Sequence, residues 1–146
     1  NKLNLKKATS SEFDKKGLHI IGLINEWTKD GKKIKGTDKN LGGTMRLGSY
    51  DAKLKENSMI KKIYKKNVIK ERHRHRYEVN IAYKEKFEKN GMIFSGLSPD
   101  GELPEIIELR NHPWFIGVQF HPEFKSRPLA PHPLFSSFIK ASKNHK

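Results

Sequence analysis

The stretch Trp114-Phe-Ile-Gly-Val-Gln-Phe-His-Pro-Glu-Phe124 decides the fold of this chain and holds its first candidate site. The apolar run that ends at Phe120 predicts a buried strand. His121 and Glu123 follow this strand directly, with Pro122 between them. In extended backbone, residues i and i+2 point to the same side, and proline restricts its own φ and the residue before it. We therefore expect the carboxylate to lie beside the imidazole at the carboxyl end of the strand, where α/β folds place ligands.

A histidine oriented by a carboxylate is the base-and-orienter half of a nucleophilic triad. The third member of such a triad would be a serine or a cysteine, and the chain contains no cysteine. The alternative is a structural turn, because most His-x-Glu pairs in any sequence are accidents of the surface. The residues alone leave catalysis and a structural turn open.

The chain of 146 residues carries a net charge of +14, which makes nucleic acid, phosphate-bearing ligands or an anionic membrane conceivable partners. Its lysines are scattered along the whole sequence without a periodic basic face, so compositional drift of the surface is the favoured explanation. With 34% hydrophobic and 10% aromatic residues, the chain has the length and the apolar content for one folded domain.

The absence of cysteine excludes a disulfide scaffold, a thiolate metal site and a cysteine nucleophile within this chain. No apolar run approaches the roughly 20 residues that a membrane span requires. The first residues, Asn1-Lys2-Leu3-Asn4, do not start the apolar segment of a signal peptide. We therefore expect a soluble, cytoplasmic protein with no membrane partner.

Apolar periodicity and turn residues predict strands that alternate with helices. His19-Ile-Ile-Gly-Leu-Ile24 is nearly continuous in apolar residues, as expected of a covered strand. Ser58 is a candidate N-cap, and Asp30-Gly31 is a hairpin signal. Strands are predicted near 19–25, 44–50, 92–96, 105–109 and 114–120, and helices near 58–66, 81–90 and 133–142. This mixture predicts an α/β domain.

The second candidate site is the run Glu71-Arg-His-Arg-His-Arg-Tyr-Glu-Val-Asn80. In extended backbone three arginines share one face and two histidines share the other: Arg72, Arg74 and Arg76 against His73 and His75. Arginine forks suit a carboxylate or a phosphate, whereas two histidines on one strand are too few to close a metal site. A solvated basic strand is the simpler interpretation. Nucleic-acid binding would require more aromatic residues than the single nearby Tyr77.

The third candidate site is a glycine-rich segment, Leu41-Gly-Gly-Thr-Met-Arg-Leu-Gly48. It fits neither a P-loop nor the dinucleotide-binding fingerprint. Its glycines are better explained by a tight approach of backbone segments.

Together these segments resemble the C-terminal part of the class I glutamine amidotransferase domain of the CTP synthase family. The resemblance extends from about Thr9 onward and agrees in order and spacing. Gln-Phe-His-Pro-Glu by itself indicates only the class I superfamily, and the other motifs narrow it to CTP synthases. The matching segments are Leu41 to Gly48, Glu71 to Asn80, Gly101 to Glu108, His112 to Phe124 and His132 to Phe135.

The resemblance implies the C-terminal portion of a flavodoxin-like α/β domain, with a mixed sheet and flanking helices. Residues 1–146 are then a partial amidotransferase domain that lacks the nucleophile half and the synthetase domain. His121 is expected to be the general base that activates a cysteine outside this chain, and Glu123 to orient its imidazole. Arg76 resembles a glutamine-binding residue. No metal site is expected in these residues.

The resemblance also implies the reaction of the full-length enzyme, the ATP-dependent amination of UTP to CTP with L-glutamine as nitrogen donor. ATP and Mg²⁺ belong to the synthetase domain, and GTP is an allosteric activator. The region before Gly42 is a candidate contributor to the GTP site, but the match from Lys33 to Lys39 is too loose to name a site residue. The expected partners are the missing N-terminal part and the other subunits of a homotetramer; nucleic acid is not among them. The chain alone is expected to be inactive.

Two alternatives stay open. One is a split or degenerate class I amidotransferase subunit whose nucleophile half is a separate polypeptide. The other is a basic nucleic-acid-binding module that uses the arginine- and histidine-rich strand. A missing half would leave the strand at 114–120 with an uncovered edge or an apolar face.

Overall fold

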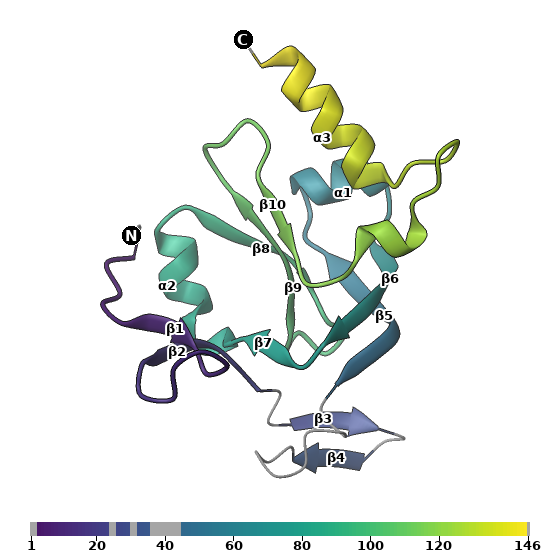
Figure 1. The fold of residues 1–146 in the computed structure, drawn as a ribbon. Helices are drawn as coiled ribbons and strands as arrows, with labels where there is room; N and C mark the ends of the chain where they lie inside the picture. The colour runs from purple at the N-terminus through teal and green to yellow at the C-terminus, as the bar shows by residue number, and fades with distance from the viewer. Residues whose placement is uncertain (1–2, 24–25, 30–31, 36–44, 146) are drawn as a thin grey trace.

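The computed structural model describes residues 3–23, 26–29, 32–35 and 45–145, and Figure 1 shows its ribbon. The elements follow the order β1 (Ala8–Ser10), β2 (Leu18–Leu23), β3 (Glu26–Lys29), β4 (Lys32–Lys35), β5 (Arg46–Leu54), α1 (Met59–Tyr64), β6 (Val68–His75), β7 (Tyr77–Val79), η2 (Ile81–Tyr83), α2 (Lys84–Lys89), β8 (Met92–Leu97), β9 (Pro104–Leu109), β10 (Ile116–Val118), η3 (Pro122–Lys125) and α3 (Pro133–Asn144). The predicted α/β mixture is confirmed. The segments 30–31 and 41–44, where a turn and a glycine-rich loop were expected, lie outside the described residues.

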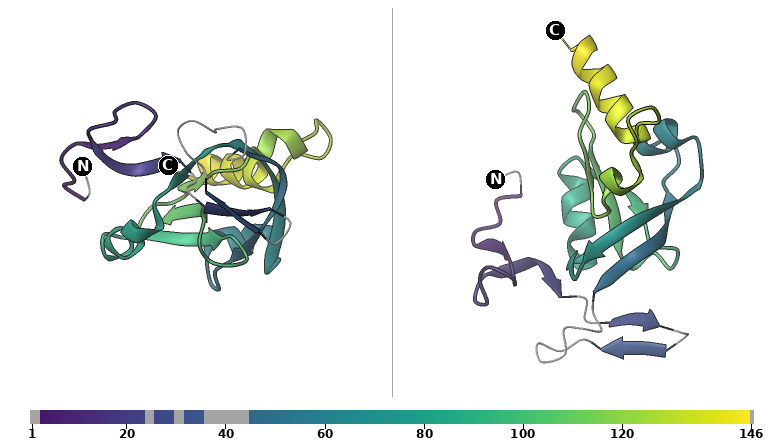
Figure 2. Two further views of the ribbon diagram at one scale, coloured as in Figure 1. Left: turned by 90° about the horizontal axis from the view of Figure 1, so that it is seen from below. Right: turned by 45° about the vertical axis from the view of Figure 1, so that its right-hand side comes forward.

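The strands form a five-stranded antiparallel sheet, a three-stranded sheet and a two-stranded pair. The five-stranded sheet has the order β10-β9-β8-β5-β6. The three-stranded sheet has the order β1-β2-β7, in which β1 and β2 are parallel and β2 and β7 antiparallel, so its pairing is mixed as predicted. Helix α2 packs on β8, and α1 contacts both α3 and β8. Helix α3 extends from one end of the molecule (Figures 1 and 2).

The predicted strand at 114–120 is shorter than expected and lies at an edge of the five-stranded sheet. Only Ile116–Val118 pairs, and β9 is its single partner within the described part of the chain. The predicted uncovered edge is therefore present.

The core lies between the five-stranded sheet and helices α1 and α3. Strand β6 alternates exposed and buried residues with the period of two that one covered face requires. At Gly96 a Cβ would lie 2.6 Å from Cδ1 of Ile106, so glycine permits the close approach of β8 and β9. The core side chains are Ala52, Leu54, Ile60, Ile69, Ile106, Phe120 and Leu134.

The predicted N-cap of the first helix is confirmed. The Ser58 side chain accepts a hydrogen bond from the Lys61 backbone N–H at 3.2 Å, as an N-cap does. The buried Glu108 carboxylate on β9 accepts two further N–H groups of this first turn, at 2.9 and 3.0 Å, and ties α1 to the sheet. The segment predicted as one helix at 81–90 divides into η2 and α2, and Gly91 follows it with a φ of 87°, the left-handed conformation that ends helices.

Candidate functional site

His121 and Glu123 meet at the end of β10, as the sequence predicts. The His121 Nδ1 and Glu123 Oε1 atoms are 2.7 Å apart. The His121 backbone N–H donates to the Arg72 carbonyl of β6 at 2.8 Å, so the base candidate is fixed to the far edge of the sheet. The backbone differs from the expected extended form, because Pro122 starts the 3₁₀ turn η3. Proline fits the first position of a helical turn, where its missing N–H is not needed.

The contact with Glu123 decides which His121 nitrogen is available. An ionised carboxylate can only accept, so Nδ1 carries the hydrogen and Nε2 keeps its lone pair. No hydrogen bond engages Nε2 among the described residues, and the His121 side chain is 37% exposed. The Phe124 ring stacks on the imidazole with centroids 4.8 Å apart. A hydrogen bond from its own backbone N–H, followed by the bond to the imidazole, lowers the pKa of Glu123 and keeps the carboxylate ionised.

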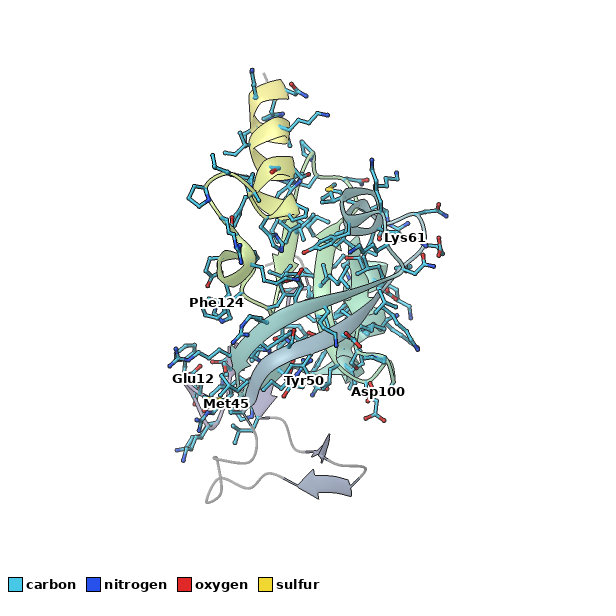
Figure 3. All side chains as sticks on the ribbon, turned by 90° about the vertical axis from the view of Figure 1, so that its right-hand side faces the viewer. Glu12, Met45, Tyr50, Lys61, Asp100 and Phe124 are labelled. Carbon is cyan, nitrogen blue, oxygen red and sulfur yellow. The ribbon has the colours of Figure 1, made fainter. Side chains whose placement is uncertain are left out.

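The arginine run divides at the end of β6. Arg72 and Arg74 are exposed on the outer face, and His73 is buried on the inner face, which confirms the predicted alternation. Arg76 lies at the bend between β6 and β7, half-buried and beyond the paired strand. Of the three arginines predicted to share one face, Arg76 lies beyond the paired part of β6, because pairing with β5 stops at His75. In the part of the chain described, no hydrogen bond or ion pair joins the Arg76 guanidinium to His121 or Glu123. Figure 3 shows Phe124 of η3 beside the paired strands β5 and β6.

The sequence did not indicate a buried charged network that is centred on Arg46 of β5 and includes Glu78 and Glu105. The Arg46 guanidinium of β5 is 3.0 Å from Glu78 Oε1 and 2.6 Å from Glu105 Oε1, and it also covers the Tyr50 ring at 4.5 Å. Gln119 donates to Glu78 and, at 2.7 Å, to the Pro104 carbonyl. The network thus connects β5, β7 and β9 to the residue two positions before His121.

Burial sets the charge states in this network. Burial raises the pKa of Glu78 to about 7, although Arg46 opposes the shift. Burial also raises the pKa of Glu105, again against the attraction of Arg46. Burial opposes the charge of Arg46, but its two carboxylate partners raise its pKa above the ordinary value. Burial and the charge of Glu105 therefore oppose ionisation of Glu78, whereas the Arg46 guanidinium favours it.

The two histidines of the inner face join the network. His73 Nδ1 and His75 Nε2 are 2.8 Å apart, and His75 Nδ1 is 3.1 Å from the Tyr77 carbonyl oxygen. His73 Nε2 lies 3.5 Å from Glu105 Oε2. The alternation of arginine and histidine predicted two opposite faces, but it did not indicate which face is buried.

Another buried carboxylate, that of Glu71, supports the start of α3. Glu71 Oε1 lies 3.1 Å from the Tyr64 hydroxyl and 3.3 Å from His132 Nε2, and Lys125 Nζ is 3.3 Å from Oε2. Burial alone would raise the pKa of Glu71, but the contacts with His132 and Lys125 lower it. His132 Nδ1 accepts the Leu134 backbone N–H at 3.3 Å. This cluster caps α3 through His132 and ties η3 to β6 through the contact of Lys125 with Glu71.

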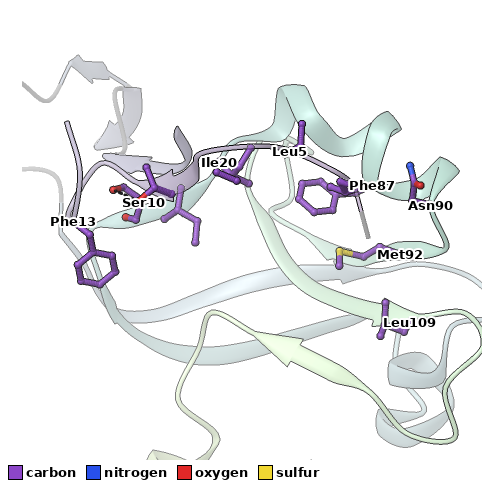
Figure 4. Close-up of a pocket in the computed structure, with 12 residues that line it drawn as sticks. Leu5, Ser10, Phe13, Ile20, Phe87, Asn90, Met92 and Leu109 are labelled. Carbon is purple, nitrogen blue, oxygen red and sulfur yellow. Dashed lines mark hydrogen bonds between the residues drawn. The ribbon is translucent and has the colours of Figure 1, made fainter. Parts of the chain in front are cut away.

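An apolar hollow lies in another part of the molecule. Figure 4 shows a pocket of about 460 Å³ between the first strands and α2, lined by residues that include Phe13, Ile20, Phe87, Met92 and Leu109. It shares no residue with the His121 and Glu123 pair and offers no charged side chain. We do not assign it to the chemistry of that pair.

Two further properties of the described residues bear on the type of site. None of the helices there is long and apolar enough to cross a membrane. Those residues also contain no group of three or more His, Asp or Glu side chains arranged to hold a metal ion.

Comparison with known proteins identifies related sequences. Residues 17–141 match the family described as Glutamine amidotransferase class-I. The chain is 88% identical to a CTP synthase of Pelagibacter ubique over 146 residues, which are 27% of that protein. It is 59% identical to a CTP synthase of Hyphomonas neptunium over 143 residues, which are 26% of that protein. The chain therefore spans about a quarter of the length of the curated relatives that it matches.

A solved structure agrees with the fold. The chain is similar, with a TM-score of 0.81 and 34% identity, to the Trypanosoma brucei CTPS glutaminase domain with bound acivicin. The alignment covers 99% of this chain and 53% of that one. The predicted fold, the C-terminal portion of a class I amidotransferase domain, is confirmed.

Proposed function

This chain belongs to the class I glutamine amidotransferase family, and we propose that it supplies the general base of a CTP synthase glutaminase site. One observation carries the proposal, the 2.7 Å contact of His121 Nδ1 with Glu123 Oε1 at the end of β10. It leaves Nε2 as a proton acceptor on an accessible imidazole. Similarity to CTP synthases along the whole chain supports the choice of reaction.

The proposed reaction begins with proton transfer to His121 Nε2 from a cysteine thiol outside this chain. The thiolate attacks the side-chain amide carbon of glutamine and forms a C–S bond. The C–N bond then breaks, and the imidazolium gives its proton to the departing ammonia. Water, deprotonated by the same imidazole, hydrolyses the thioester to glutamate and the free thiol. Glu123 stabilises the imidazolium in both steps.

Arg76 is proposed to bind the α-carboxylate of glutamine. A guanidinium presents two parallel N–H groups to a carboxylate, which gives orientation as well as affinity. Its half-buried place at the bend after β6 supports this role, because a partly desolvated charge binds more strongly than an exposed one.

The ammonia is proposed to reach a synthetase domain that aminates UTP to CTP with ATP. ATP, UTP and Mg²⁺ would bind outside these residues, so we assign no residue of this chain to them. The rest of the enzyme, in a homotetramer activated by GTP, would then be the partner of this segment.

The test uses a full-length chimera in which these 146 residues replace the matching segment of the Pelagibacter ubique CTP synthase. His121→Ala should abolish CTP formation from glutamine and spare CTP formation from added ammonia, which needs no glutaminase chemistry. His145→Ala, an exposed histidine after α3, is the control and should change neither rate. Loss of both activities would assign His121 a structural role, and retention of both would exclude it as the base.

A further inference from the structure

We infer that His73 and His75 are positioning residues for the glutamine site, a neutral hydrogen-bonded pair that fixes the bend carrying Arg76. The inference rests on the proposed role of Arg76 in binding glutamine. Its basis is a continuous row of contacts from Glu105 on β9 to the Tyr77 carbonyl on β7.

The Tyr77 carbonyl at the end of this row determines which ring nitrogens donate and which accept. A carbonyl oxygen can only accept, so His75 Nδ1, 3.1 Å away, carries the hydrogen. In a neutral ring His75 Nε2 is then an acceptor, and His73 Nδ1 at 2.8 Å must donate to it. His73 Nε2 is left with a lone pair that faces Glu105 Oε2 at 3.5 Å.

The surroundings keep both rings uncharged. Burial first and the Arg46 cation second lower the pKa of His73 to about 3 and that of His75 to about 4. The charged or titratable groups that face the pair among the described residues are Arg46, Tyr50, Glu78, Glu105 and His121. A second proton on either ring would replace an accepted hydrogen bond by a clash of two donors.

The bend at Arg76 joins two different sheets, and the histidine pair spans it. Strand β6 ends with His75 opposite Arg46 of β5, whereas β7 begins with Tyr77 opposite Leu23 of β2. Within the described part of the chain, Arg76 therefore pairs with neither β5 nor β2. The bond from His75 Nδ1 to the Tyr77 carbonyl closes this gap, and Arg46 holds the adjacent Glu78. Without the bond, the guanidinium would sample a wider range of positions and bind glutamine less often.

The experiment compares two substitutions in the full-length chimera. His75→Phe keeps the aromatic volume but removes the donor, and it should raise KM for glutamine about tenfold with a smaller change in kcat, the size expected for one lost hydrogen bond. His75→Asn places an amide N–H near the position of Nδ1 and should restore most of the affinity. CTP formation from ammonia should be equal in both variants.

Other outcomes overturn the inference. An unchanged KM for glutamine in His75→Phe excludes the positioning role. An equal rise of KM in His75→Asn shows that the donor to Tyr77 is not the operative group. A fall of kcat at constant KM assigns the pair to the chemical step instead.

Arg76→Ala separates this inference from the proposed function. If Arg76→Ala raises KM and His75→Phe does not, only the positioning role fails. If Arg76→Ala leaves KM unchanged, the glutamine-binding role fails and the positioning role falls with it, while the assignment of His121 as base is tested by its own variant. A double variant whose KM equals that of Arg76→Ala alone supports the inference, because residues acting through one another are not additive.

Discussion

Glu123 acts on the chemistry only through His121, so its loss is a test of the orienting contact. Its carboxylate lies 2.7 Å from Nδ1 and is 56% exposed, which leaves room for a substitution without repacking the core. An amide in its place could present either an acceptor or a donor to the ring. It would not stabilise the imidazolium that forms when the thiol is deprotonated.

We predict that Glu123→Gln lowers kcat for glutamine hydrolysis in the chimera by at least about a hundredfold, the range of general acid–base contributions. KM for glutamine should change little, because Glu123 is not proposed to touch the substrate. Glu85→Gln on α2 is the control, since that carboxylate is 87% exposed and 3.9 Å from Lys89. A higher KM for glutamine with an unchanged kcat would contradict the orienting role.

The burial of His73 and His75 leads to a second prediction, which concerns how the free energy of unfolding depends on pH. Burial and Arg46 lower the pKa of His73 to about 3 and of His75 to about 4, whereas an unfolded histidine titrates near about 6.5. Between these values the unfolded state binds more protons, so the free energy of unfolding falls as pH falls from about 6.5 to the folded pKa values. Glu78, whose pKa is raised to about 7, acts oppositely, because its contribution is lost as pH rises from its ordinary value toward 7.

Ring resonances in NMR spectra check this directly. His73 and His75 should stay neutral, each with one protonated nitrogen, from pH 8 down to pH 5. Replacing both by asparagine should flatten the loss of stability on acidification, measured as the denaturation midpoint against pH. Titration of either ring near its ordinary pKa would contradict the buried row of hydrogen bonds.

At the scale of elements, local sequence signals predicted where helices and strands occur, but they did not predict which strands pair. Ser58 and apolar periodicity predicted α1, and the helix predicted near 133–142 agrees with α3, which starts at Pro133. The edge position of β10 and its shorter length depend on contacts with β9, which local sequence does not specify. The same limit applied to the buried network, because Arg46 reaches Glu78 across 32 positions of sequence. The His121 and Glu123 contact was predictable because two positions separate the residues.

The cap of α1 gives a stability prediction. Ser58 is 4% exposed, and its hydroxyl accepts the Lys61 N–H while donating to the Lys55 carbonyl at 2.6 Å. Ser58→Ala should reduce the free energy of unfolding by about 1 kcal/mol, the usual cost of losing an N-cap. The measurement is a thermal or denaturant midpoint, with the exposed Ser142→Ala in α3 as control. Equal midpoints for the two variants would show that Glu108 alone caps this helix.

At the scale of the whole molecule, apolar surface and an open strand edge coincide. Strand β10 ends the five-stranded sheet, and large apolar side chains remain exposed on α3 and near β10, among them Phe115, Phe135, Phe138 and Ile139. The chain also spans only 53% of the glutaminase domain that it resembles. Unpaired edges and apolar patches of this kind are surfaces that other protein covers.

We therefore predict that the 146-residue chain by itself associates or has poor solubility and shows no glutaminase activity. It contains no cysteine to act as nucleophile, whatever the state of His121. Adding the rest of the Pelagibacter ubique enzyme, as a second chain or in the chimera, should suppress association and create activity that depends on His121. Light scattering and glutamine hydrolysis measure the two effects on the same samples. A monomer that unfolds cooperatively would show that the edge needs no cover, and activity of the chain alone would exclude the cysteine mechanism.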